Sequence, residues 1–189
     1  KYSRLPKNKV VGMAGILDSS RFIYFLSQEL KVPVSKIESF VLGGHGDTMV
    51  AMVNHTKIDG TPLIDIVKQG KIEKKVLDQI INRTKNGGAE IVKFLEKGSA
   101  FYAPAASGVL MAESYIFNKK NQLPCAAFLN GEYGVNNLYA GVPVVIGNGG
   151  VEKVIELKLS EEERNNFDKS IKAVRELFEA AKKIDKDLI

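Results

Sequence analysis

Short apolar runs separated by tight turns alternate in this chain with long helical stretches, and this arrangement constrains the fold most. The strand-like runs over residues 125–129, 142–146 and 151–157 predict strands, and residues 147–150 form a glycine-rich turn between the last two. Because strands follow one another through turns while the helices cluster, the pattern predicts an α+β fold rather than regular βαβ units.

The first part of the chain carries shorter strand signals. Strands are expected at residues 10–13, 39–42 and 48–54, and the Asp59-Gly60 pair predicts a hairpin turn. Helical spacing of apolar residues predicts four helices before the last strands, over residues 19–31, 62–70, 73–96 and 104–117.

Local signals also mark the ends and the interior of these helices. Asp18, Ser19 and Ser20 supply N-cap chemistry for the first helix, and the Gly87-Gly88 pair predicts a bend or break in the third.

A last helix is predicted after Ser160, which matches a capping box with Glu163. Its apolar residues fall on one face at helical spacing: Phe167, Ile171, Val174, Leu177, Phe178, Ala181, Ile184 and Leu188.

Composition narrows the class of protein. A chain of 189 residues with 44% apolar residues can bury a core without disulfides. The single cysteine, Cys125, excludes an internal disulfide and indicates a reducing compartment, so we expect a cytoplasmic protein. Cys125 lies in an apolar run and is expected to be a small buried hydrophobe rather than a reactive thiol.

The charge pattern favours neither nucleic acid nor membrane as a partner. The formal net charge is +5, but acidic residues interleave with the lysines, which indicates solvated helix faces. No apolar stretch reaches the roughly 20 residues needed to span a bilayer. The chain begins with Lys1 and shows no signal peptide, so we expect a piece of a longer protein.

Two segments, residues 17–22 and 43–49, carry the candidate chemistry. The first places Asp18 and Arg21 three residues apart, so both side chains can face one site from a helix. The second places His45 among glycines after an apolar strand, where the backbone can bend sharply and a ligand can approach.

Structural roles explain the same residues without chemistry. Asp18 can serve only as a helix cap, Arg21 as a surface charge, and His45 as a turn histidine. His45, Asp47 and His55 do not have the spacing of a metal motif, so no metal site is expected, and His55 is given no role.

These two segments, in this order and at this separation, resemble the lactate/malate dehydrogenase family, and the resemblance extends over nearly the whole chain. It is carried by residues 9–22, 43–47, 98–107 and 142–147. Residues 98–107 look more like the lactate-dehydrogenase-like malate dehydrogenases than like the lactate dehydrogenases. The resemblance implies a C-terminal catalytic and substrate-binding domain over residues 1–189, with antiparallel strands packed by long helices.

The same resemblance implies a preceding NAD-binding Rossmann domain, with residues 1–17 as the segment and strand that lead in from it. The mark of such a domain is a Gly-x-Gly-x-x-Gly turn between a strand and a helix. Residues 147–150 do not supply this turn, because a predicted strand follows them. We therefore expect that the Rossmann domain is absent from this sequence and that the chain alone is inactive.

The resemblance further implies an NAD-dependent enzyme of the tricarboxylic acid cycle that interconverts (S)-malate and oxaloacetate. His45 would accept the proton in oxidation and donate it in reduction, Asp18 would orient its ring, and Arg21 would bind the substrate carboxylate. These residue types suit these roles, because histidine titrates near neutrality and arginine matches a carboxylate with two hydrogen bonds. NAD itself carries the hydride.

Three more residues are placed near substrate or cofactor by the resemblance. Ala100 stands where lactate dehydrogenases have a threonine, which favours malate or oxaloacetate, and Ser99 would line the same pocket. Pro104 and His45 would lie near the nicotinamide. The alternatives are an L-lactate dehydrogenase, or a catalytically silent domain that assembles subunits, since the family forms homodimers and homotetramers.

Overall fold

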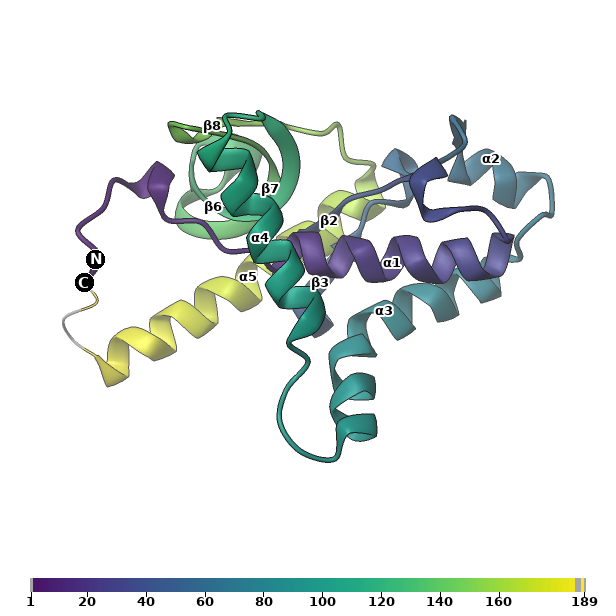
Figure 1. Cartoon of the computed structure of the whole chain (residues 1–189), viewed down its shortest axis with the longest axis horizontal. Coiled ribbons are helices and arrows are strands. Elements are labelled where there is room, and N and C mark those ends of the chain that lie inside the picture. Colours follow the sequence, from purple (N-terminus) through teal and green to yellow (C-terminus); the bar gives the residue numbers. More distant parts are fainter. Residues whose placement is uncertain (1, 186–187, 189) are drawn as a thin grey trace.

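The computed structural model describes residues 2–185 and residue 188, and within them helices and antiparallel strands segregate as an α+β fold (Figure 1). The α-helices are α1 (Ala14–Leu30), α2 (Leu63–Lys68), α3 (Lys74–Leu95), α4 (Tyr102–Ile116) and α5 (Glu161–Ile184). The strands are β1 (Ile37–Glu38), β2 (Val41–Gly43), β3 (Met49–Ala51), β4 (Lys57–Ile58), β5 (Thr61–Pro62), β6 (Asn121–Asn130), β7 (Asn136–Gly147) and β8 (Gly150–Val154).

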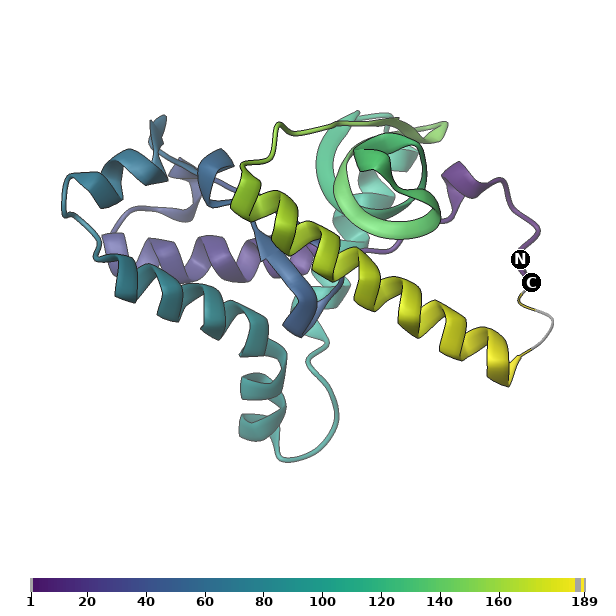
Figure 2. The ribbon, with the colours of Figure 1, turned by 180° about the vertical axis from the view of Figure 1, so that it is seen from behind.

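The main sheet is antiparallel and has the order β3-β2-β7-β6, with β8 also paired to β7. The long strands β6 and β7 curl strongly, and α5 runs past them on the side seen in Figure 2. A second, small sheet has the order β1-β4-β5 and contains the hairpin predicted at Asp59-Gly60. Both of these residues have positive φ, as a tight two-residue hairpin turn requires.

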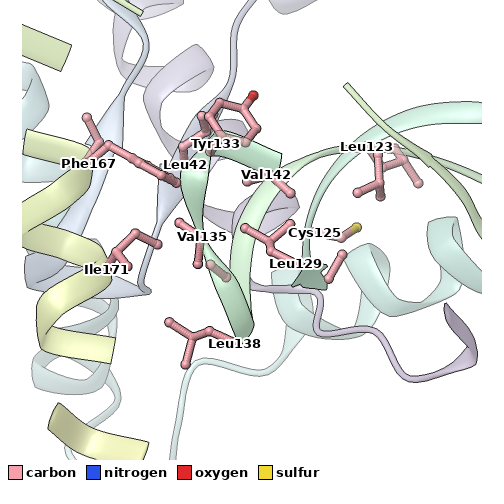
Figure 3. Close-up of a cluster of buried hydrophobic side chains, with 14 of the residues drawn as sticks. Leu42, Leu123, Cys125, Leu129, Tyr133, Val135, Leu138, Val142, Phe167 and Ile171 are labelled. Atoms are coloured by element: carbon pink, nitrogen blue, oxygen red, sulfur yellow. The ribbon is translucent and has the colours of Figure 1, made fainter. Parts of the chain in front are cut away.

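The larger hydrophobic core lies between the main sheet and α5 (Figure 3). Phe167 and Ile171 of α5 pack there against sheet residues such as Leu42 and Val142. The rings of Phe167 and Tyr133 lie 5.2 Å apart between centroids. Cys125 is fully buried in this core and burial raises the pKa of its thiol to about 12, so the prediction of a small buried hydrophobe is confirmed.

A second core joins α1 to α2, α3 and the small sheet. Phe22 and Leu26 of α1 are fully buried in it, beside Leu63 of α2 and Leu77 of α3. Because α1 also contributes Ile16 to the larger core, this helix is held from two sides.

Two predictions at the start of the chain are wrong. Helix α1 begins at Ala14, five residues before the predicted start, so Asp18 lies inside the helix and does not cap it. The predicted strand over residues 10–13 contains only an isolated bridge between Gly12 and Ala126. The helix start was mispredicted because the polar Asp-Ser-Ser run resembles a cap, whereas Asp18 and Ser19 make tertiary contacts with His45 and Val41.

Helix α3 is bent but not broken. Its backbone is helical without interruption across Gly87-Gly88, and Figures 1 and 2 show that its axis changes direction partway along. The capping box of Ser160 and Glu163 is present at the start of α5. The apolar face of α5 is covered only over its first half, because Leu177 and Ile184 are 73% and 90% exposed.

Replacing Phe167 with alanine should lower the free energy of unfolding by about 3–5 kcal/mol, because the change empties a fully buried aromatic site. Denaturant unfolding followed by circular dichroism measures this loss. Leu177→Ala on the same helix is the matched control and should change stability by less than about 0.5 kcal/mol. Equal losses in the two variants would contradict this account of the core.

Candidate active site

His45 follows strand β2 and lies at the start of a short 3-10 turn over Gly46–Thr48. Gly43 has a φ of +84°, a backbone conformation that side chains disfavour, and this turns the chain out of the sheet. The side chain of His45 is about half exposed. The turn therefore presents the imidazole at the surface while its backbone stays attached to the main sheet.

Asp18 and His45 are brought together from helix α1 and the end of β2. Asp18 Oδ2 lies 2.8 Å from His45 Nδ1, which matches the separation of about 3 Å expected for a hydrogen bond. The Asp18 side chain is only 2% exposed, so its carboxylate is held in one place. This contact fixes Nδ1 toward the protein and leaves Nε2 as the nitrogen free to meet a substrate.

Arg21 lies one helical turn after Asp18 on the same face of α1. Its Nη1 is 3.6 Å from Asp18 Oδ1, which is an ion pair rather than a hydrogen bond. The aliphatic part of Arg21 lies against α3, where a Cβ on Gly87 would come within 3.1 Å of Arg21 Cδ. The glycine pair, predicted only to bend α3, therefore also gives Arg21 room to lie along that helix.

The hydrogen bond from the ring of His45 to the carboxylate of Asp18 raises the pKa of His45 above its ordinary value of about 6.5. Burial and the charge of Arg21 act in the opposite direction, and the charge of Asp18 adds to the rise. The carboxylate of Asp18 thus stabilises the imidazolium form of His45, which helps the ring to hold a proton near neutral pH.

A cavity of about 190 Å³ lies beside this group and is lined by Asp18, His45, Tyr139 and Val174, among others. A larger cleft of about 570 Å³ adjoins the same turn, but neither His45, Asp18 nor Arg21 lines it. The smaller cavity is therefore the one next to the candidate chemistry. The fold brings Tyr139 and Val174 to this cavity, and the sequence did not mark either of them as a site residue.

Two buried polar atoms of the site, Asp18 Oδ1 and Arg21 Nε, have no hydrogen-bond partner within the described chain. Buried polar groups are nearly always paired in proteins, so this position suits an added polar ligand. Arg21 does not line the cavity beside His45, but its guanidinium has the geometry to bind an anionic group such as a carboxylate.

Ser99, Ala100 and Pro104 come from the segment that ends α3 and begins α4. Ser99 and Ala100 are in the connection between α3 and α4, and Pro104 is in the first turn of α4. None of the three is among the residues that line the cavity beside His45. Their predicted contacts with substrate and cofactor stay predictions.

The remaining candidates have structural surroundings. His55 Nε2 lies 3.0 Å from the backbone oxygen of Lys158. In the described residues, no group of three or more histidine, cysteine and acidic side chains is placed to hold a metal ion. No helix in the same part of the chain combines the length and apolar character needed to cross a membrane.

Comparison with known proteins agrees with the fold. Residues 16–185 match the family described as lactate/malate dehydrogenase, alpha/beta C-terminal domain. The chain therefore belongs to the lactate/malate dehydrogenase family. Over 188 residues it is 64% identical to the malate dehydrogenase of Pelagibacter ubique, and the match covers 100% of this chain and 59% of that protein.

Two crystal structures show how closely the backbone is shared. The malate dehydrogenase of Cryptosporidium parvum matches with a TM-score of 0.93 and 47% identity, over 96% of this chain and 58% of that one. The lactate dehydrogenase of Eimeria maxima, solved with NADH and oxamate, matches with a TM-score of 0.93 and 41% identity, over 97% and 57%. The chain thus spans just under three fifths of the length of these relatives.

Asp18→Asn should lower the pKa of His45, because the amide cannot stabilise the imidazolium as a carboxylate does. In the unsubstituted chain, the raised pKa of His45 adds to the free energy of unfolding. This contribution is fully present below about pH 6.5, and it is lost as the pH rises through the pKa of His45 in the folded chain. NMR titration of the ring protons measures the pKa, with Asp47→Asn as the control near the same turn. An unchanged pKa in Asp18→Asn would rule out the hydrogen bond as its cause.

Proposed function

We propose that this chain is the substrate-binding and acid–base half of an NAD-dependent malate dehydrogenase. The observation that carries the proposal is the hydrogen bond between buried Asp18 and half-exposed His45, with the guanidinium of Arg21 beside it. The identity of 64% to a malate dehydrogenase supports the choice of activity.

In this proposal, His45 takes the hydroxyl proton of (S)-malate during oxidation and returns it during reduction of oxaloacetate. Loss of hydride from a carbon requires removal of the proton on its oxygen, so a base must lie at that oxygen. Nε2 of His45 serves this purpose, because Nδ1 is occupied by Asp18 at 2.8 Å. Asp18 stabilises the imidazolium that forms, without accepting the proton itself.

Arg21 binds the carboxylate next to the reacting carbon. Its fork of N–H groups matches the two oxygens of a carboxylate, and the side chain is only 11% exposed, so few other orientations are open to it. In this proposal, His45 transfers the proton and Arg21 orients the substrate.

NAD is proposed as the cofactor, and it supplies hydride transfer when it is bound. His45 and Pro104 would face its nicotinamide end. The described residues contain no glycine-rich turn between a strand and a helix to hold the phosphates, so the rest of the nucleotide needs a second domain. We propose that residues 1–17 lead in from that domain and that residues 1–189 form the catalytic one.

The proposed substrate is a dicarboxylate, and the proposed alternative is the pyruvate and lactate pair. Ala100 and Ser99 are the residues of this chain expected to lie near the substrate's variable end. A small Ala100 leaves space that a threonine would fill, which favours the larger oxaloacetate. We further propose a cytoplasmic homodimer or homotetramer that acts in the tricarboxylic acid cycle.

The chain joined to the remaining part of the Pelagibacter ubique malate dehydrogenase should oxidise NADH with oxaloacetate. The kcat/KM for oxaloacetate should exceed that for pyruvate, because Ala100 leaves room for the second carboxylate. The loss of NADH absorbance, followed with each substrate in turn, gives the ratio of the two kcat/KM values. A higher value with pyruvate would favour the lactate dehydrogenase alternative.

His45→Asn in the joined protein should lower kcat by about 10²–10⁴-fold, the usual contribution of a general acid–base group. Circular dichroism and thermal unfolding establish that the variant is folded. Turnover at the unsubstituted rate would remove His45 from the mechanism and favour the domain that only assembles subunits.

The 189-residue chain alone should show no steady oxidation of NADH with oxaloacetate. Without a phosphate-binding turn among its described residues, it lacks the contacts that hold a dinucleotide. The joined protein, assayed at equal concentration, is the positive control. Sustained turnover by the chain alone would contradict this prediction.

A further inference from the structure

Strand β2, which leads into His45, is hydrogen-bonded to two serine side chains from different helices. All three residues of β2 pair with β3, whereas β7 pairs with it only through Gly43 and Gly141. At the two ends of the strand, the N–H groups of Val41 and Gly44 donate to serine hydroxyls instead. The backbone that carries His45 thus depends on side chains for part of its support.

The first serine, Ser19, directly follows Asp18 in α1 and is 4% exposed. Its Oγ accepts a hydrogen bond from the N–H of Val41 at 3.0 Å and donates one to the carbonyl oxygen of Gly15 at 2.7 Å. The bond from Val41 attaches the helical turn that holds Asp18 to the start of β2, and the bond to Gly15 lies within α1 and orients the hydroxyl.

The second serine, Ser170, lies in α5 and is 2% exposed. Its Oγ accepts a hydrogen bond at 2.8 Å from the N–H of Gly44, the residue directly before His45. A Cβ on Gly43 would collide with this hydroxyl, so the glycine is required for α5 to approach the strand so closely. Ser170 and Gly44 are 126 residues apart in the sequence.

We propose that Ser19 and Ser170 are positioning residues, which hold the two ends of β2 and so keep the ring of His45 within hydrogen-bond distance of Asp18. Ser19 acts on the side of the carboxylate and Ser170 on the side of the imidazole. Buried side chains that hold reactive groups in this way set their geometry to within a fraction of an ångström. The consequence for turnover rests on the proposed function, whereas the consequence for the ring of His45 does not.

The charged and titratable groups around His45 come from several elements. Asp18 and Arg21 approach His45 from α1, and Tyr139 of β7 lines the same cavity. The larger cleft next to the turn is lined by Asp47 of the turn itself, by Asp78 and Lys85 of α3, and by Lys169 of α5. Serine-to-alanine changes alter none of these charges.

The experiment is an NMR titration of His45 in the 189-residue chain and its Ser170→Ala and Ser19→Ala variants. The chain has two histidines, so His55, which contacts the backbone of Lys158, is the internal reference. Both variants should lower the pKa of His45, because a looser turn weakens the hydrogen bond to Asp18.

Ser114→Ala is the matched control for both variants. Ser114 is fully buried, and its Oγ also accepts a backbone N–H, from Asn121 at 3.1 Å, and donates to a carbonyl, of Ile146 at 2.7 Å. It makes these bonds between α4, β6 and β7, where none of its partners is part of the candidate site. Its loss should lower the free energy of unfolding without moving the titration of His45.

The proposal is overturned if Ser170→Ala and Ser19→Ala are folded and His45 titrates in both as in the unsubstituted chain. If either alanine variant does not fold, Ser170→Cys or Ser19→Cys takes its place, because cysteine fills a similar volume with a weaker acceptor. In a cysteine variant, a smaller decrease in the pKa of His45 than that expected for alanine supports the proposal, and an unchanged pKa overturns it.

Turnover provides a second readout in the joined protein. Ser170→Ala should lower kcat about tenfold, since small displacements of a reacting group are costly, while KM for oxaloacetate stays within about twofold. Unchanged kcat would count against the positioning role. Loss of all activity in the unsubstituted joined protein would count against the proposed function, and the NMR titration would still decide the role of the serines.

Discussion

Helix α1 is packed into both hydrophobic cores, and the rest of the structure depends on this placement. Ile16 faces the core of the main sheet, whereas Phe22 and Leu26 face the core shared with α2 and α3. Asp18 lies between these apolar faces and is 1% exposed. A helix packed into two hydrophobic cores cannot shift without exposing buried side chains, so the carboxylate of Asp18 has a defined position.

Burial of that carboxylate has a cost that its neighbours offset. An ionised group removed from water must be paired or hydrogen-bonded to remain charged. Asp18 meets this requirement through His45 at 2.8 Å and Arg21 at 3.6 Å. The same contacts hold an imidazole and a guanidinium beside one carboxylate, so the demand for charge compensation and the proposed chemistry lead to the same arrangement.

Local sequence signals predicted those features that are held by hydrogen bonds between residues close together in the chain. The capping box of Ser160 and Glu163 and the Asp59-Gly60 hairpin are present because their hydrogen bonds are made within a few residues. The start of α1 was mispredicted, because a polar run suited to capping is used for tertiary contacts instead. The apolar face of α5 was predicted from its period, but how far it is covered depends on where the sheet ends.

The sequence by itself determined the α+β class, most helices and the pairing of Asp18 with Arg21, because all three follow from spacing along a few turns of chain. The family resemblance implied that Asp18 orients the ring of His45, 27 residues away, but only the tertiary structure gives the separation of 2.8 Å and brings Ser170 of α5 to the N–H of Gly44. The tertiary structure also decided that Ser99, Ala100 and Pro104 do not line the cavity beside His45. These contacts join distant segments through the packing of two cores, and no local pattern of residues encodes such distances.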